Sequence, residues 1–80
     1  KLGSDWVTLF ISGGRKDKIS KGDIAGLLFK QGDLEKHELG IIELKQDCAF
    51  VAVAKNKANI IVEKTNNSRL KKKKVRISIL

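Results

Sequence analysis

The chain has 80 residues, which is enough for one small domain that buries only about 60% of its unfolded surface. Seventeen Lys and Arg against nine Asp and Glu give a formal net charge of +8. Such an excess favours a polyanionic partner or an anionic surface. One cysteine excludes an internal disulfide, and the longest apolar run, residues 48–54, is too short to span a bilayer. We therefore expect a domain from a reducing compartment with no membrane partner.

The first four residues, 1–4, read as the translation of two adjacent cloning sites, and the chain contains no Met. We expect them to be a cloning remnant and the native domain to occupy residues 5–80, cut from a longer protein.

The first half of the domain predicts a strand, a basic loop and a helix. Apolar and other side chains alternate over residues 6–12, which is typical of a strand that buries one face and leaves Phe10 on the other. Ser20 stands three residues before Asp23, the spacing of a capping box, and predicts that a helix starts there. Gly32 is the expected C-terminal cap of that helix.

The second half predicts two strands, a helix and a last strand. Residues 33–38 are a polar connection with room for one helical turn, and the strands cover residues 40–45 and 48–54. Asn56 is a candidate cap for a helix over residues 55–64, and alternation returns over residues 75–80.

The resulting order is βαββαβ, which predicts an α+β, ferredoxin-like (RRM-like) fold: a four-stranded antiparallel sheet with two helices on one face. The other face is then bare. By alternation it carries Phe10 and Phe50 on neighbouring central strands.

Two segments concentrate positive charge. The first is the loop after the first strand, with Arg15, Lys16, Lys18 and Lys21. The second precedes and enters the last strand, with Arg69, Lys71, Lys72, Lys73, Lys74 and Arg76. We interpret both as phosphate-binding candidates. The alternative is that the first is a solvated turn and that the second protects a strand edge from aggregation.

Single-stranded RNA is often bound by stacking bases on aromatic side chains of a four-stranded sheet. Phe10 and Phe50 are the candidates for that role. The alternative is that both pack under a neighbouring loop or another domain of the parent protein.

No catalytic or metal site is expected. His37 and Cys48 cannot supply the four protein ligands of a structural zinc site, and Ser12 fits neither a nucleophile elbow nor a triad.

Several of these residues resemble one family. Residues 9–19 (LFISGGRKDKI) are similar to the opening of the RNA-binding domain of DbpA/CsdA-type bacterial DEAD-box RNA helicases. The helix start at 21–24 (KGDI) and the strand segments 39–42 (LGII) and 49–53 (AFVAV) are also similar to that family. Cys48 and Gln46 depart from the usual RNA-recognition motif, in a stacking position and a basic position, which shifts weight to the basic loop and the last-strand edge.

The resemblance implies an RNA-binding accessory domain at the C-terminal end of an ATP-dependent RNA helicase. Arg15, Lys16 and Lys18 would contact RNA, which in some members is large-subunit ribosomal RNA. ATP and Mg²⁺ would bind the helicase core of the same chain and not this domain, and the protein would be cytoplasmic.

Two other functions fit the same fold. The bare sheet face could bind an apolar segment of a protein partner. An acyl-phosphate hydrolase also occurs on ferredoxin-like folds, but the Gly-Val-x-x-Arg pattern that would support it is missing.

Overall fold

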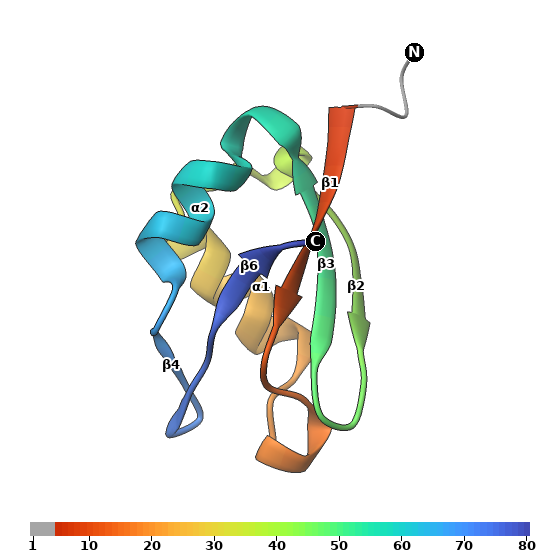
Figure 1. The fold of residues 1–80 in the computed structure, drawn as a ribbon, viewed down its shortest axis with the longest axis vertical. Helices are drawn as coiled ribbons and strands as arrows, with labels where there is room; N and C mark the ends of the chain where they lie inside the picture. The colour runs from red at the N-terminus through yellow and green to blue at the C-terminus, as the bar shows by residue number, and fades with distance from the viewer. Residues whose placement is uncertain (1–4) are drawn as a thin grey trace.

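Four strands form one antiparallel sheet in the order β2-β3-β1-β6, in a computed structural model that describes residues 5–80 (Figure 1). The prediction for residues 1–4 lies outside the described residues. The elements in chain order are β1 (Trp6–Ile11), η2 (Arg15–Asp17), α1 (Lys21–Lys30), η3 (Lys36–Glu38), β2 (Leu39–Leu44), β3 (Ala49–Ala54), η4 (Lys55–Lys57), α2 (Ala58–Thr65), β4 (Arg69–Leu70), β5 (Lys73–Lys74) and β6 (Ile77–Ile79); those labelled η are single 3-10 turns.

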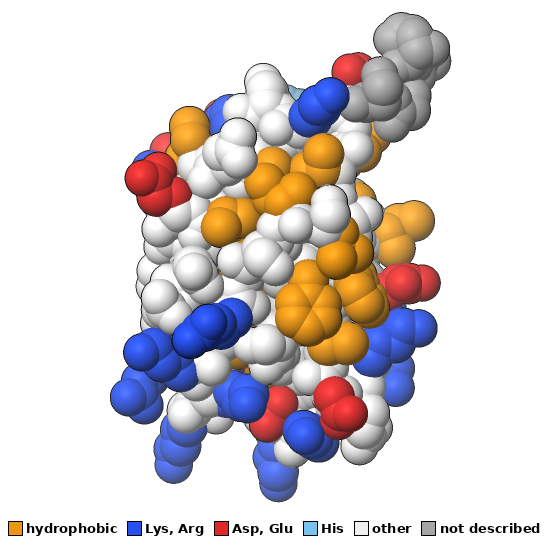
Figure 2. All heavy atoms as spheres, viewed as in Figure 1, with side chains coloured by type: hydrophobic (Ala, Val, Ile, Leu, Met, Phe, Trp, Pro, Cys, Tyr) orange, Lys and Arg blue, Asp and Glu red, His pale blue; other side chains and the backbone are white. Residues whose placement is uncertain are grey.

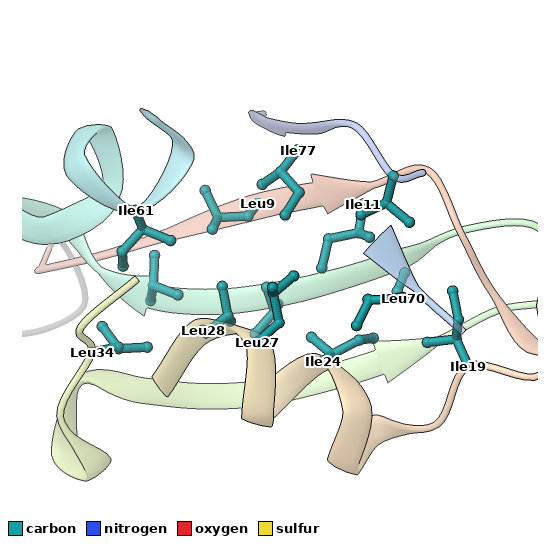
Figure 3. Close-up of a cluster of buried hydrophobic side chains, with 14 of the residues drawn as sticks. Leu9, Ile11, Ile19, Ile24, Leu27, Leu28, Leu34, Ile61, Leu70 and Ile77 are labelled. Atoms are coloured by element: carbon teal, nitrogen blue, oxygen red, sulfur yellow. The ribbon is translucent and has the colours of Figure 1, made fainter. Parts of the chain in front are cut away.

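Both α-helices cover the same face of the sheet, which confirms the predicted ferredoxin-like fold. Side chains from β1, β6, α1 and α2 meet in one buried cluster between the sheet and the helices (Figure 3). Its members that are fully buried include Leu9, Ile11, Ile24, Leu28 and Ile61. Aliphatic burial of this kind is the main stabilising term in so small a domain.

Helix α1 begins where the capping box predicts. The Asp23 backbone N–H donates to Ser20 Oγ at 3.1 Å, and the Ser20 backbone N–H donates to Asp23 Oδ2 at 2.9 Å. The predicted C-terminal cap was wrong: Gln31 is the capping residue, and the left-handed backbone with φ 56° is at Asp33, not Gly32. Aspartate is one of the few non-glycine residues that adopt this conformation, because a short polar side chain can form local hydrogen bonds.

Helix α2 starts later than predicted, at Ala58. Asn56 is not its cap, because residues 55–57 form the 3-10 turn η4 and Lys57 takes the capping position without a side-chain hydrogen bond. The face of the helix that packs on the sheet buries Ala58, Ile61 and Thr65. Thr65 Oγ1 donates to the Ile61 carbonyl at 2.6 Å, so the buried hydroxyl is satisfied.

The C-terminal strand is shorter than predicted, because β6 covers only Ile77–Ile79. The lysine run before it does not lie along the edge of the main sheet. It forms a separate two-stranded hairpin, in which Arg69 is paired with Lys74 and Leu70 with Lys73. The third strand also begins one residue later than predicted: β3 starts at Ala49, so Cys48 precedes it.

No helix among residues 5–80 has the length and apolar content needed to cross a membrane.

Candidate nucleic-acid interface

The basic loop after β1 is held in a defined position by the turn between β2 and β3. The Arg15 backbone N–H donates to the Lys45 carbonyl at 2.9 Å, and the Lys16 N–H donates to the Gln46 carbonyl at 3.1 Å. A Cβ at Gly14 would lie 2.4 Å from the Lys45 carbonyl oxygen, so only glycine allows this close approach. The loop therefore presents its cations from a backbone that is hydrogen-bonded to the β2–β3 turn.

The lysine hairpin shares its base with this loop. The Ser12 N–H donates to the Arg76 carbonyl at 3.0 Å, and the Arg76 N–H donates back to Ser12 Oγ at 2.8 Å. A Cβ at Gly13 would lie 3.0 Å from Val75 Cγ1. Residues more than sixty positions apart in the chain are thus joined at the foot of both basic segments.

The hairpin tip also reaches α1. Lys71 Nζ lies 4.0 Å from Asp23 Oδ2, at the helix start. A shallow groove of about 300 Å³ separates the hairpin from α1 and is lined by residues that include Gly26, Lys30 and Arg69. The two basic segments and the first turn of α1 therefore form one surface.

We call this surface the basic end. Figure 1 shows the loop after β1 and the β4 hairpin at the same end of the molecule, and Figure 2 shows Lys and Arg side chains gathered there. It contains the sequence-predicted residues Arg15, Lys16, Lys18, Lys21, Lys71, Lys72, Lys73, Lys74 and Arg76, of which all but the half-buried Lys73 are exposed.

The acidic side chains at the basic end are engaged within the protein. Asp17 accepts the Gly14 N–H at 3.2 Å, and Asp47 lies 3.4 Å from Lys16 Nζ. The pKa of Asp23 is lowered from its ordinary value of 3.8, chiefly because the Ser20 backbone N–H donates to it; partial burial opposes this, and the Ser20 hydroxyl and the Lys71 charge add to it. These carboxylates shape the surface and leave it with a strong positive excess.

Phe10 and Phe50 lie where alternation predicts, on the face of the sheet that the helices leave bare. They are direct cross-strand partners, and their rings meet edge to face with centroids 5.8 Å apart and planes at 62°. Both are half-buried. The pair therefore offers a joined aromatic surface and not two separate rings.

Trp6 belongs to the same face and was missed in the sequence. Its cross-strand partner is Ala54, two positions further along each strand than the Thr8–Ala52 pair, and its side chain is 42% exposed. The indole Cζ3 lies 3.3 Å from the place that a Cβ of Gly40 would take, so the glycine makes room for the ring. Alternation from Phe10 and Thr8 back to Trp6 was the available signal.

The comparison with known families decides what this arrangement belongs to. The family model described as the DbpA RNA-binding domain matches residues 8–79, almost the whole chain. The chain belongs to this family. The expectation from the motifs at residues 9–19, 21–24, 39–42 and 49–53 is confirmed.

A full-length relative with a similar segment is the ATP-dependent RNA helicase DbpA of Bacillus subtilis (strain 168). It is 24% identical to this chain over 78 residues, which are 98% of the chain and 16% of the relative. The chain thus spans about a sixth of that protein's length.

Within this DbpA-family domain the candidate residues fall into two regions. The cations gather at the basic end, and the aromatic pair lies on the bare sheet face next to it, because Phe10 precedes the basic loop by only a few residues. Trp6 marks the opposite end of the same face, beside an open pocket that His37 and Asn56 also line.

Proposed function

We propose that this chain is the RNA-binding accessory domain of a DEAD-box RNA helicase, and that it anchors the helicase core to structured RNA through the basic end. The observation that carries the proposal is the joining of two distant cationic segments into one surface of a DbpA-family domain. Folding alone gives little reason to collect so many like charges, because they repel one another.

The chemistry of the basic end suits a phosphate backbone. Lysines on flexible stems contact phosphates without reading the sequence, and each contact releases condensed counterions. The exposed ion pair between Lys16 and Asp47 contributes little to stability, so Lys16 can exchange its partner for a phosphate.

The sheet face would add contacts to bases. Phe10 and Phe50 supply an aromatic surface on which an unpaired base can stack, a contact that contributes about 1–3 kcal/mol per base. In this proposal the phosphates next to that base lie on the basic loop.

The wider setting is part of the proposal. We propose that the RNA is large-subunit ribosomal RNA, that the parent protein is a cytoplasmic ATP-dependent RNA helicase, and that ATP and Mg²⁺ bind its helicase core while this domain carries neither. The similarity of this chain to the ATP-dependent RNA helicase DbpA of Bacillus subtilis supports the helicase assignment.

The test of the anchoring surface is a matched pair of charge reversals, Lys16→Glu and Lys36→Glu. Lys36 is also exposed, but it belongs to η3, away from the basic end. Binding to a labelled ribosomal stem-loop, measured by fluorescence anisotropy, should weaken about tenfold or more for Lys16→Glu and much less for Lys36→Glu. Equal losses in the two variants would mean that net charge, and not a located surface, drives binding.

The protein-interaction alternative has one observation in its favour. Ile41, on the same bare face as Phe50, is 77% exposed, and large exposed aliphatic side chains often mark a protein contact. If Phe10→Ala abolished the association of the domain with its helicase core while RNA affinity stayed intact, the sheet face would be assigned to a protein.

A further inference from the structure

The turn of the lysine hairpin has a backbone that lysine disfavours. Lys71 has φ 51° and Lys72 has φ 72°, so two adjacent non-glycine residues are left-handed. A two-residue hairpin loop with positive φ at both positions is the type I′ turn, for which Asn-Gly is the favoured sequence. Lysine has a Cβ that crowds the following carbonyl in this conformation. The two lysines at the tip therefore destabilise the turn relative to the favoured Asn-Gly sequence.

The short strands on either side of the turn add a second unfavourable feature. Arg69 lies directly opposite Lys74, and like charges in a cross-strand pair destabilise a hairpin. Each strand has only two residues, and the hairpin contributes a single side chain from its strands, Leu70, to the buried cluster. Little in the hairpin itself offsets these costs.

Protection of a sheet edge does not explain the lysines. The hairpin is a separate two-stranded sheet and does not border β6, so its lysines do not cover an edge of the main sheet. Solubility does not explain their position either, because exposed sites with ordinary backbone are available elsewhere on the chain.

We propose that the Lys71–Lys72 turn is a phosphate-binding tip that enters between neighbouring phosphodiesters of the bound RNA, and that it keeps its lysines although they destabilise the hairpin. This inference rests on the proposed RNA-binding function and assigns it to one element. Residues held in sparsely populated backbone conformations often cluster at ligand contacts, where their functional role outweighs the cost of the strain.

The geometry favours a phosphate over a base as the ligand of the tip. Lys71 is placed beside Asp23 at 4.0 Å, while Lys72 is exposed at the apex. An ammonium group is a compact point charge, suited to an anionic oxygen rather than to the planar edge of a base. Binding at the tip should therefore depend on charge and salt but little on sequence.

The test replaces the tip by the sequence that the turn prefers, Lys71→Asn with Lys72→Gly. The double variant should keep or raise the melting temperature, because the backbone strain is relieved. It should nevertheless bind a labelled RNA stem-loop roughly tenfold more weakly near physiological salt, and the slope of log affinity against log salt should become shallower by about 1.4, which is 0.7 for each lost contact. A scrambled single strand should lose affinity by a similar factor.

The matched control is Lys36→Gln with Lys55→Gln, which also removes two positive charges, but from η3 and η4 at the other end of the molecule (Figure 1). It should bind nearly as well as the wild type. Lys71→Arg with Lys72→Arg keeps the charges and should also retain affinity. If the Asn-Gly variant loses its circular-dichroism spectrum, Lys71→Gln with Lys72→Gln tests the same charges.

Each outcome decides between the inference and the function on which it rests. Wild-type binding with no loss in the Asn-Gly variant would overturn the phosphate-binding tip and leave the proposed function intact. Equal losses in the Asn-Gly and control variants would also overturn it, in favour of net charge. A wild-type domain that binds phosphatidylserine vesicles but neither RNA would overturn both.

Discussion

At the scale of single residues, we predict opposite effects on stability when two glycines, Gly14 and Gly26, are replaced by alanine. A Cβ at Gly14 would lie 2.4 to 2.7 Å from backbone atoms of the β2–β3 turn, which cannot move aside, whereas a Cβ at Gly26 would meet nothing within 4 Å. Gly14→Ala should therefore destabilise the domain by about 1–3 kcal/mol, and Gly26→Ala should stabilise it by about 0.5–1 kcal/mol by removing a glycine from a helix.

Equilibrium urea denaturation of the two variants beside the wild type checks both signs. A Gly14→Ala domain as stable as the wild type would contradict the docking of the basic loop on the β2–β3 turn.

The lowered pKa of Asp23 makes the stability of the domain depend on acid pH. Its carboxylate is held below the ordinary pKa of 3.8, chiefly by the Ser20 backbone N–H, so the folded state binds this proton less readily than the unfolded chain does. The stabilising effect is therefore complete above about pH 4–5 and is lost as the pH falls through 3.8 toward the lower folded-state value. Asp23→Asn should flatten this part of the stability curve.

Melting temperatures measured from neutral pH down to about pH 2 provide the test. Glu63→Gln, which removes an exposed carboxylate from α2, is the control. An Asp23→Asn domain with an unchanged acid profile would show that the capping carboxylate does not contribute.

The residues that the sequence predicted correctly are those whose environment is local. Ser20 and Asp23 are three positions apart and meet within one helical turn, so their spacing alone predicts the capping box. The predicted capping roles of Gly32 and Asn56 were wrong, because the position of a helix end depends on the neighbouring segment. The chain after α1 turns at Asp33, and a 3-10 turn precedes α2.

At the scale of elements, Leu70 is the side chain that anchors the strands of the lysine hairpin in the core. Leu70 is buried in the cluster between α1 and the sheet (Figure 3). Its neighbours in the hairpin are charged. Leu70→Ala should reduce the free energy of unfolding by about 2–4 kcal/mol, since it removes buried aliphatic surface and leaves a cavity. It should also weaken RNA binding, because the hairpin loses its fixed place at the basic end.

Urea denaturation and anisotropy on the same samples measure the two effects together. Ile60→Ala is a suitable control, because Ile60 is a large aliphatic residue that is 46% exposed on α2. A Leu70→Ala domain that keeps both wild-type stability and wild-type affinity would show that the hairpin is not held by this contact.

Strands and helices with a clear apolar period were predicted well, and the hairpin was not. Alternation over residues 6–12 and 48–54 fixes which side chains face the core, and so it placed Phe10 and Phe50 correctly as neighbours. The turn at Lys71 and Lys72 contains neither Gly nor Asn, so the usual signal of a two-residue hairpin is absent from the sequence. Only tertiary contacts, above all Leu70 in the core, identify that element.

At the scale of the whole molecule, the fold joins two cationic segments that are far apart in the sequence. The sequence shows each of them separately, but their meeting depends on the pairing of β1 with β6 and on the bonds between Ser12 and Arg76. Such long-range contacts cannot be derived from local spacing. We therefore propose that the basic end binds the RNA backbone as one surface.

The measurement that tests this proposal most directly is the affinity of the wild-type domain for a labelled ribosomal stem-loop across a series of salt concentrations. A scrambled strand of equal length is titrated in parallel. With about four to six phosphate contacts, the slope of log affinity against log salt should lie between about −3 and −4. Tighter binding of the stem-loop would further support anchoring to structured RNA. An affinity that does not change with salt, or no binding to either RNA, would contradict a role of the basic end in binding the RNA backbone.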